Sequence, residues 1–307
     1  MSRVAHCDSE RTAGETLGSR RGGSQRVKEV EVVRALACGV ASIGVPIDNT
    51  LYDRLASTWW EEDENMALLR TGMNPARFGY MRRVLREDLG LDPAGLLCLD
   101  VGCGGGLLAE EFAKLGCRLV GVDPSEASLE TARAHARQQA LEIEYRVAAG
   151  EDLPFEDGAF DVVYCCDVLE HVESVERTVA ESARVLRPGG VYLYDTINRT
   201  RRSRLVIIKL LQEWEATRCM EPDVHDWQMF IKPAELDGIL RHHGLEPRGT
   251  VGLAPAVSPL ALLRNLRRRR RGEISYAELG RRLRIHETGA LWGSYAGYAV
   301  NPRAAAH

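Results

Sequence analysis

The 307-residue chain contains little lysine and no long apolar run, and each shortage narrows the classes of protein that fit it. Of its 40 basic residues only Lys28, Lys114, Lys209 and Lys232 are lysines, and the net charge of −4 gives no case for nucleic acid. No apolar stretch approaches the roughly 20 residues that span a bilayer. The N-terminus also lacks the apolar core of a signal peptide. We therefore expect a cytoplasmic protein.

Eight cysteines occur, but none is arranged as Cys-x-x-Cys, the spacing of zinc knuckles and redox motifs. Cys98 and Cys165 lie in apolar, strand-like runs, where a reduced cysteine behaves as a small hydrophobic residue. The cysteines predict a reduced protein without a disulfide framework or a structural zinc site.

Three parts of the chain differ in their sequence pattern. Residues 1–46 are polar and then rich in Ala, Gly and Val, which predicts a poorly ordered tail. In residues 47–94, Tyr52, Leu55 and Trp59 recur at helical spacing, and a second helix is expected from Asn74 to about Leu89. We interpret 47–94 as an N-terminal helical cap that either covers the sheet of the next domain or closes over its ligand.

Residues 95–307 alternate apolar strands with helical patterns. Such alternation is typical of a mostly parallel sheet with helices on both faces. The sequence predicts an α/β, Rossmann-like, seven-stranded sheet with flaps or insertions at 199–230 and 255–290. The expected strands are 96–101, 118–122, 142–148, 160–166, 191–197, 245–251 and 294–300, and the expected helices are 107–115, 125–140, 167–186 and 232–243.

Glycines cluster directly after the first strand, in the stretch Asp-Val-Gly-Cys-Gly-Gly-Gly. Glycines here let the backbone turn sharply and approach a ligand closely. A carboxylate at the end of the second strand is placed to accept hydrogen bonds from a ribose diol. Ligands of open parallel sheets bind at the carboxyl ends of the strands. Five candidate ligand-binding residues fall at such ends: Asp100, Gly102, Asp123, Glu151 and Asp167.

Several motifs together resemble the class I S-adenosylmethionine-dependent methyltransferases over about 96–197. They are the glycine stretch, Val-Asp-Pro-Ser, Leu-Pro-Phe followed by Phe-Asp-Val-Val, and Leu-Arg-Pro-Gly-Gly. A narrower set, from about 47 to 240, is similar to the ubiquinone-biosynthesis O-methyltransferases, which methylate a catechol-like hydroxyl on a polyprenylated ring. This set comprises Trp59-Trp60, Asn74-Pro-Ala-Arg-Phe-Gly-Tyr80, Asp167-Val-Leu-Glu-His171, Thr196-Ile-Asn-Arg199 and His225-Asp-Trp to Pro-Ala-Glu-Leu236.

The resemblance implies S-adenosyl-L-methionine as the cofactor. Gly102 and Gly104 would face its methionine end, Asp123 would bind the ribose, and Gly150 and Glu151 would lie near the adenine. Arg77 would approach the cofactor carboxylate. The whole expected cofactor set is Arg77, Asp100, Gly102, Gly104, Asp123, Gly150, Glu151 and Cys166.

The expected catalytic residues are Asp167, Glu170 and His171. A phenolic hydroxyl has a pKa near ~10, so it needs a base or a metal ion to react near neutrality. On a helix the three residues would share one face, and two carboxylates with an imidazole suit Mg²⁺, Zn²⁺ or Mn²⁺. The resemblance adds Asn198 as a fourth metal ligand. The alternative is a metal-free site in which His171 is the general base, and His225 is expected to order its own loop.

Two basic segments leave further alternatives open. The segment 201–214 either contacts a membrane peripherally, at its inner face, or covers the acceptor pocket. The run Arg267–Arg271 lies in an expected irregular insertion, without interleaved aromatic residues, and is interpreted as a solvated loop. No nucleic-acid partner is expected.

The expected function is O-methylation of a small phenolic, catechol-like or hydroquinone-like acceptor. One alternative is a natural-product methyltransferase with another acceptor, including N- or C-methylation, because one fold supports many acceptors. A nucleic-acid methyltransferase is disfavoured by Cys166-Asp-Val-Leu, where such enzymes carry an Asn-Pro-Pro-Tyr type of motif. An NAD-linked oxidoreductase is disfavoured by the glycine stretch, and a membrane-associated cofactor-binding protein is the alternative outside enzymes.

Overall fold

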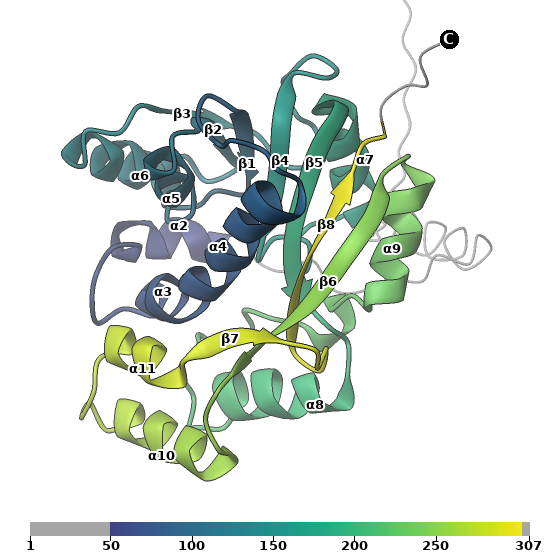
Figure 1. The fold of residues 1–307 in the computed structure, drawn as a ribbon. Helices are drawn as coiled ribbons and strands as arrows, with labels where there is room; N and C mark the ends of the chain where they lie inside the picture. Colours follow the sequence, from purple (N-terminus) through teal and green to yellow (C-terminus); the bar gives the residue numbers. More distant parts are fainter. Residues whose placement is uncertain (1–49, 303–307) are drawn as a thin grey trace, which may run out of the picture. The chain divides into compact units, whose positions relative to one another are not determined.

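An eight-stranded sheet forms the centre of residues 50–302, the part of the chain that the computed structural model describes (Figure 1). Its strand order is β3-β2-β1-β4-β5-β8-β6-β7. The strands are β1 (Leu97–Val101), β2 (Arg118–Asp123), β3 (Ile143–Val147), β4 (Phe160–Cys166), β5 (Leu186–Ile197), β6 (Glu246–Pro255), β7 (Ile285–Thr288) and β8 (Ser294–Val300). The predicted tail 1–46 lies outside the described residues.

Strands β1 to β5 pair in parallel, whereas β8 runs antiparallel between β5 and β6. All seven predicted strands are present, and the α/β Rossmann-like class is confirmed. The strand count is corrected from seven to eight, because β7 pairs with Gly252–Pro255 at the end of β6. Its four residues, Ile-His-Glu-Thr, are too few and too polar to mark a strand in the sequence.

Helices cover both faces of the sheet, and alternate residues of β1 show this. Leu99 and Val101 pack in one apolar core with α7 (Val175–Val185) and α9 (Pro233–His242). Cys98 packs in the opposite core, which α4 (Asn74–Arg83) and α5 (Ala109–Lys114) complete. Helix α6 (Glu126–Gln138) packs against β3.

Two groups of short helices lie at the carboxyl end of the parallel strands (Figure 1). The first precedes β1 and consists of α2 (Thr50–Leu55), η1 (Ala56–Thr58), α3 (Met66–Leu68) and η2 (Leu69–Met73), followed by α4 and η3 (Val84–Asp88). The second comes from later segments and consists of α8 (Arg201–Ser203), η4 (Arg204–Glu213), η5 (Trp227–Met229), α10 (Pro259–Arg270) and α11 (Tyr276–Leu283). Within residues 50–302, no helix combines the length and apolarity needed to cross a bilayer.

The segment 255–290 is ordered, so the expectation of an irregular insertion with a solvated arginine loop is wrong. Arg267 to Arg270 form the last turn of α10, and Arg271 is its C-cap. Leu266, Leu279 and Leu283 from α10 and α11 are buried in a separate apolar cluster. The charged run masks the apolar periodicity that produces these helices.

The segment after β4 also differs from its prediction. Asp167 has a φ of 53°, and the chain forms turns until Ser174 caps α7 by accepting a hydrogen bond from the backbone N–H of Arg177. The expected helix therefore begins about eight residues late, and Asp167, Glu170 and His171 do not share a helical face.

Candidate active site

The glycine loop after β1 is fixed by the end of β2. The backbone N–H of Gly102 donates to the Val122 carbonyl at 2.8 Å, and that of Gly104 donates to Asp123 Oδ2 at 2.9 Å. Gly102 and Gly104 have φ values of 74° and 50°, which L side chains rarely adopt. A Cβ atom on Gly102 would also lie 2.3 Å from the Val168 side chain, so this position requires glycine.

Two carboxylates accompany the loop. Burial raises the pKa of Asp100 to about 8, and the nearby Asp123 adds to the shift. Burial also raises the pKa of Asp123, whose oxygens accept hydrogen bonds from the backbone N–H groups of Gly104 and Ser125. Asp123 adds to the raised pKa of Asp100, and Asp53 adds to that of Asp123, so a cationic ligand would be stabilised here.

The first helices of the described chain cover this loop. The Trp59 ring packs so closely that a Cβ atom on Gly105 would lie 2.2 Å from its Cγ. Trp59 Nε1 donates to Ser128 Oγ at 3.1 Å. Trp60 Nε1 donates to the Gly105 carbonyl at 3.0 Å, and its ring stacks on His135 with 3.4 Å between centroids. Both tryptophans thus hold the cap against the glycine loop and α6.

Arg77 lies between two aspartates at the ends of β4 and β5. Its guanidinium forms ion pairs with Asp167 and, at 3.3 Å, with Asp195. The backbone N–H of Asp167 donates to Asp195 Oδ1 at 2.8 Å. Burial raises the pKa of Asp195 to about 7, while Arg77 lowers it. Asp195 was not predicted as a site residue, because it occupies an interior position of a buried strand.

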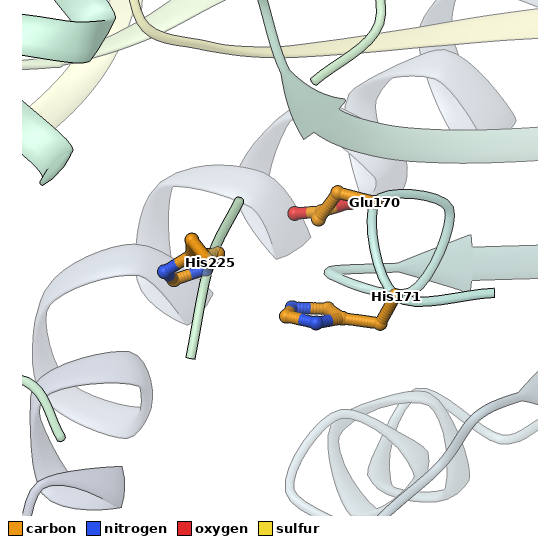
Figure 2. Close-up of side chains that lie close together, drawn as sticks. All are labelled: Glu170, His171 and His225. Carbon is orange, nitrogen blue, oxygen red and sulfur yellow. The ribbon is translucent and has the colours of Figure 1, made fainter. Parts of the chain in front are cut away.

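Glu170, His171 and His225 form a compact cluster, in which the two residues of the turn face the loop that carries His225 (Figure 2). One potential ligand atom from each lies within 4.8 Å of the others. Glu170 Oε2 accepts a hydrogen bond from Thr196 Oγ1 at 2.7 Å, whereas its buried Oε1 has no hydrogen-bond partner. The rings of His171 and His225 lie 5.1 Å apart.

Burial keeps this cluster uncharged near neutral pH. Burial and the neighbouring Asp167 raise the pKa of Glu170 to about 8. Burial and His225 hold the pKa of His171 well below its usual range, and burial lowers the pKa of His225 to about 4. A neutral imidazole has one nitrogen that can accept a proton or coordinate a cation. Once that nitrogen is protonated, it can do neither.

The cluster differs from the set expected from sequence. Asp167 is engaged by Arg77, and the Asn198 side-chain amide donates to the Leu291 carbonyl. His225 belongs to the cluster, which the sequence did not predict. The Gln212 side chain holds the backbone of His225: its Nε2 donates to the His225 carbonyl at 3.0 Å, and its Oε1 accepts from the His225 N–H at 2.9 Å. The loop is therefore ordered by Gln212, and the ring of His225 faces the cluster. The motif His-Asp-Trp was the sequence signal that could have identified His225 as a site residue.

The other predicted cofactor residues lie at the same edge of the sheet. Gly150 follows β3, and an added Cβ atom would lie 3.0 Å from both Val101 and Thr178. Glu151 Oε1 accepts a hydrogen bond from the backbone N–H of Glu173 at 2.9 Å, in the turn before α7. Cys166 ends β4, where burial raises the pKa of its thiol well above the ordinary value.

A cavity of about 190 Å³ opens beside the cluster. Asp167, His171 and His225 line it, together with Tyr52 of α2, and most of the other lining side chains are aliphatic. Tyr52 connects the two sites, because its ring stacks on Trp59 at 6.3 Å and meets His171 edge-on at 5.9 Å. The sequence marked Tyr52 only as an apolar position of a helix.

Residues 99–194 match the family model described as a methyltransferase domain. The chain is 38% identical over 216 residues to the ubiquinone biosynthesis O-methyltransferase of Caulobacter sp. strain K31, covering 68% of this chain and 84% of that protein. It is also 38% identical over 208 residues to the protein of the same name from Ruegeria pomeroyi, covering 66% and 83%.

Solved structures share the fold at low sequence identity. The magnesium protoporphyrin IX methyltransferase of Synechocystis PCC 6803, with bound S-adenosylhomocysteine, superposes with a TM-score of 0.54 at 19% identity, covering 84% of this chain and 96% of that one. An S-adenosylmethionine-dependent methyltransferase from Aquifex aeolicus gives a TM-score of 0.51 at 13% identity, covering 83% and 98%.

Proposed function

Because the chain belongs to the family of the ubiquinone biosynthesis O-methyltransferases, and is an S-adenosylmethionine-dependent methyltransferase, we propose that it methylates a phenolic oxygen of a small catechol- or hydroquinone-like acceptor. The observation that carries this proposal is the position of neutral His171 on the wall of an apolar cavity. Its ring is linked through Tyr52 and Trp59 to the glycine loop.

The proposed reaction is an in-line displacement. The acceptor oxygen forms a bond to the methyl carbon while the carbon–sulfur bond breaks, and the sulfonium becomes a neutral thioether. The phenolic proton passes to the neutral imidazole of His171, which later releases it to solvent. The apolar cavity excludes water, and the enzyme contributes mainly by aligning the two reacting groups.

As the alternative to His171 as general base, we propose a divalent cation, Mg²⁺, Zn²⁺ or Mn²⁺, at Glu170, His171 and His225. The buried, unpartnered Oε1 of Glu170 and the depressed pKa values of both imidazoles fit this role. Because metal ligands must be deprotonated, a bound cation would displace the proton that burial keeps on Glu170. When bound, a cation supplies Lewis acidity that lowers the pKa of a coordinated acceptor oxygen. Thermal unfolding after chelation and metal add-back tests it: a rise in Tm in the wild type but not in Glu170→Gln supports the cation.

His171→Ala is the decisive variant for the reaction. We expect at least a ~100-fold loss of kcat with a catechol acceptor, the range that one acid–base group contributes. Calorimetric binding of S-adenosylhomocysteine should remain, which shows that the variant is folded. His242→Ala is the matched control, because His242 is an exposed residue at the C-terminal end of α9. Unchanged methylation by His171→Ala would refute the proposed role.

We also propose that the protein works in the cytoplasm with peripheral contact to the inner face of a membrane through 201–214. Leu205 and Trp214 are exposed, at 54% and 49%, and Arg201 and Arg202 at the start of the same segment are exposed as well. Ile207 is buried and packs inward. Co-sedimentation with phosphatidylglycerol vesicles should fall in the double variant Leu205→Asp, Trp214→Asp, and equal sedimentation of variant and wild type would reject this contact.

A further inference from the structure

Helices α10 and α11 line the cavity that opens at the proposed catalytic residues. Leu262 and Leu266 of α10 and Leu283 of α11 face the cavity that also contains Asp167 and His171. The cavity therefore has two chemically different parts. One part carries ionisable groups at the ends of the parallel strands, and the other is mostly aliphatic, with Asn65 and Glu221 as further polar residues of the lining.

The aliphatic part is continuous with a buried cluster. Leu266 and Leu279 are fully buried there, and Cys219, Ile274 and Leu283 complete it. A wall of this kind offers no hydrogen bonds, so a polar group placed against it would lose its hydration without compensation. Hydrocarbon is the chemistry that gains by binding there.

Helix α11 is held against the cap by backbone contacts. A Cβ atom on Gly72 would lie 3.2 Å from the Cα of Gly280, so η2 and α11 approach as closely as two glycines allow. Thr71 Oγ1 donates to the Ala277 carbonyl at 3.0 Å, and the Ala277 N–H donates to the Glu62 carbonyl at 3.2 Å. Contacts of this kind fix the distance from the aliphatic wall to the cap.

The arginine run fixes α10 in the same way. Arg269 pairs with Asp63 of the cap at 3.2 Å and lies 3.9 Å from the centroid of the Tyr276 ring. Its Nη1 also donates to the Ile274 carbonyl at 3.2 Å. Arg270 Nε donates to the Glu215 carbonyl at 2.9 Å. Opposite charges and carbonyls thus neutralise a run that would otherwise repel itself.

We propose that α10 and α11 set the maximum length of the hydrocarbon substituent that the acceptor ring can carry. The ring lies at His171, and its substituent extends along the cavity until it meets Leu262, Leu266 and Leu283. This inference rests on the proposed function, but it concerns the far end of the cavity rather than the reacting end. It makes Leu262 a specificity-determining residue.

A series of 4-alkylcatechols with tails of increasing length tests the proposal on the full chain. Calorimetry in the presence of S-adenosylhomocysteine gives the Kd, and methylation rates give kcat/KM. In the wild type, affinity should rise up to about fourfold per methylene, reach an optimum, and then fall as the tail meets the wall. Leu262→Ala should move the optimum to longer tails by roughly two carbons, and Leu262→Trp should move it to shorter tails.

Leu260→Ala is the matched control, because Leu260 lies on the same helix, is 81% exposed and does not line the cavity. Its length profile should equal that of the wild type. An optimum that stays the same in both Leu262 variants, or an affinity that shows no optimum in the wild type, overturns the proposal. Length-dependent binding without methylation of any catechol would refute the proposed reaction and leave the length limit standing.

Discussion

The stability of the Glu170→Gln variant should depend on pH in a way that the burial of Glu170 dictates. Glu170 is 1% exposed, and its pKa is raised from 4.5 to about 8, by burial first and by Asp167 second. The folded protein therefore keeps this proton at pH values where the unfolded chain has lost it. The contribution of protonated Glu170 to the free energy of unfolding is fully present below pH ~4.5 and is lost as the pH rises towards ~8.

The size of the effect follows from the two pKa values. Keeping the proton costs the wild type about 1 kcal/mol at pH 5.5 and about 4 kcal/mol at pH 8. Glutamine keeps an oxygen that can accept the hydrogen bond of Thr196 and does not titrate. The free energy of unfolding of Glu170→Gln minus that of the wild type should therefore increase by about 3 kcal/mol between these pH values.

Urea unfolding in the presence of chelator, at half-unit steps from pH 5 to pH 8.5, measures this difference. The constant part of the substitution, including any loss of packing, cancels in the comparison across pH. A difference that is flat or decreases with pH would refute the assignment of a protonated Glu170. The same variant should be deficient in methyl transfer, so stability and activity change in opposite directions at high pH.

Three further substitutions test other contacts. Arg77→Met should lower the free energy of unfolding at pH 7 by about 3–5 kcal/mol in urea unfolding, because Asp195 is left buried without its cation. At pH 5 the loss should be smaller, because Asp195 is then protonated and uncharged. Gly105→Ala should displace the Trp59 ring, whose Cγ would lie 2.2 Å from the new Cβ, and shift tryptophan emission to longer wavelength. Gly238→Ala, in α9 with no atom within 4 Å of the added Cβ, should raise the free energy of unfolding by about 0.5–1 kcal/mol and leave the emission unchanged.

The sheet could be predicted from sequence because its strands are local patterns. Strands β4 and β8 have the expected bounds, since buried strands read as apolar runs bounded by turn residues. Strand β7 could not be predicted because its four residues are too few and too polar to mark a strand. The helices α10 and α11 could not be predicted because the arginines of this segment mask their apolar spacing. Helix α11 packs against η2 and α3 of the cap, α10 packs against α11, and β7 pairs with β6, so all three elements depend on tertiary contacts.

The site was predictable only in part, for a related reason. Glu170 and His171 are neighbours in one motif, so the sequence identifies them together. The helical geometry assumed for them fails because Asp167 adopts a positive φ and Ser174 delays the helix. His225 joins them from a separate loop, and its role depends on the hydrogen bonds of Gln212.

The contacts between α11 and the cap have a consequence for the order of folding. Thr71 and Ala277, which share a hydrogen bond, are 206 residues apart in the chain, and Asp63 and Tyr276 are 213 apart. Closing loops of this length is entropically costly, so such contacts form late. Strands β1 to β5 all lie before residue 200, whereas the cavity is lined in part by residues from the last quarter of the chain. The cavity is therefore completed after the half of the sheet that carries the glycine loop, and the folding chain passes through a stage that has this loop but no enclosed cavity beside it.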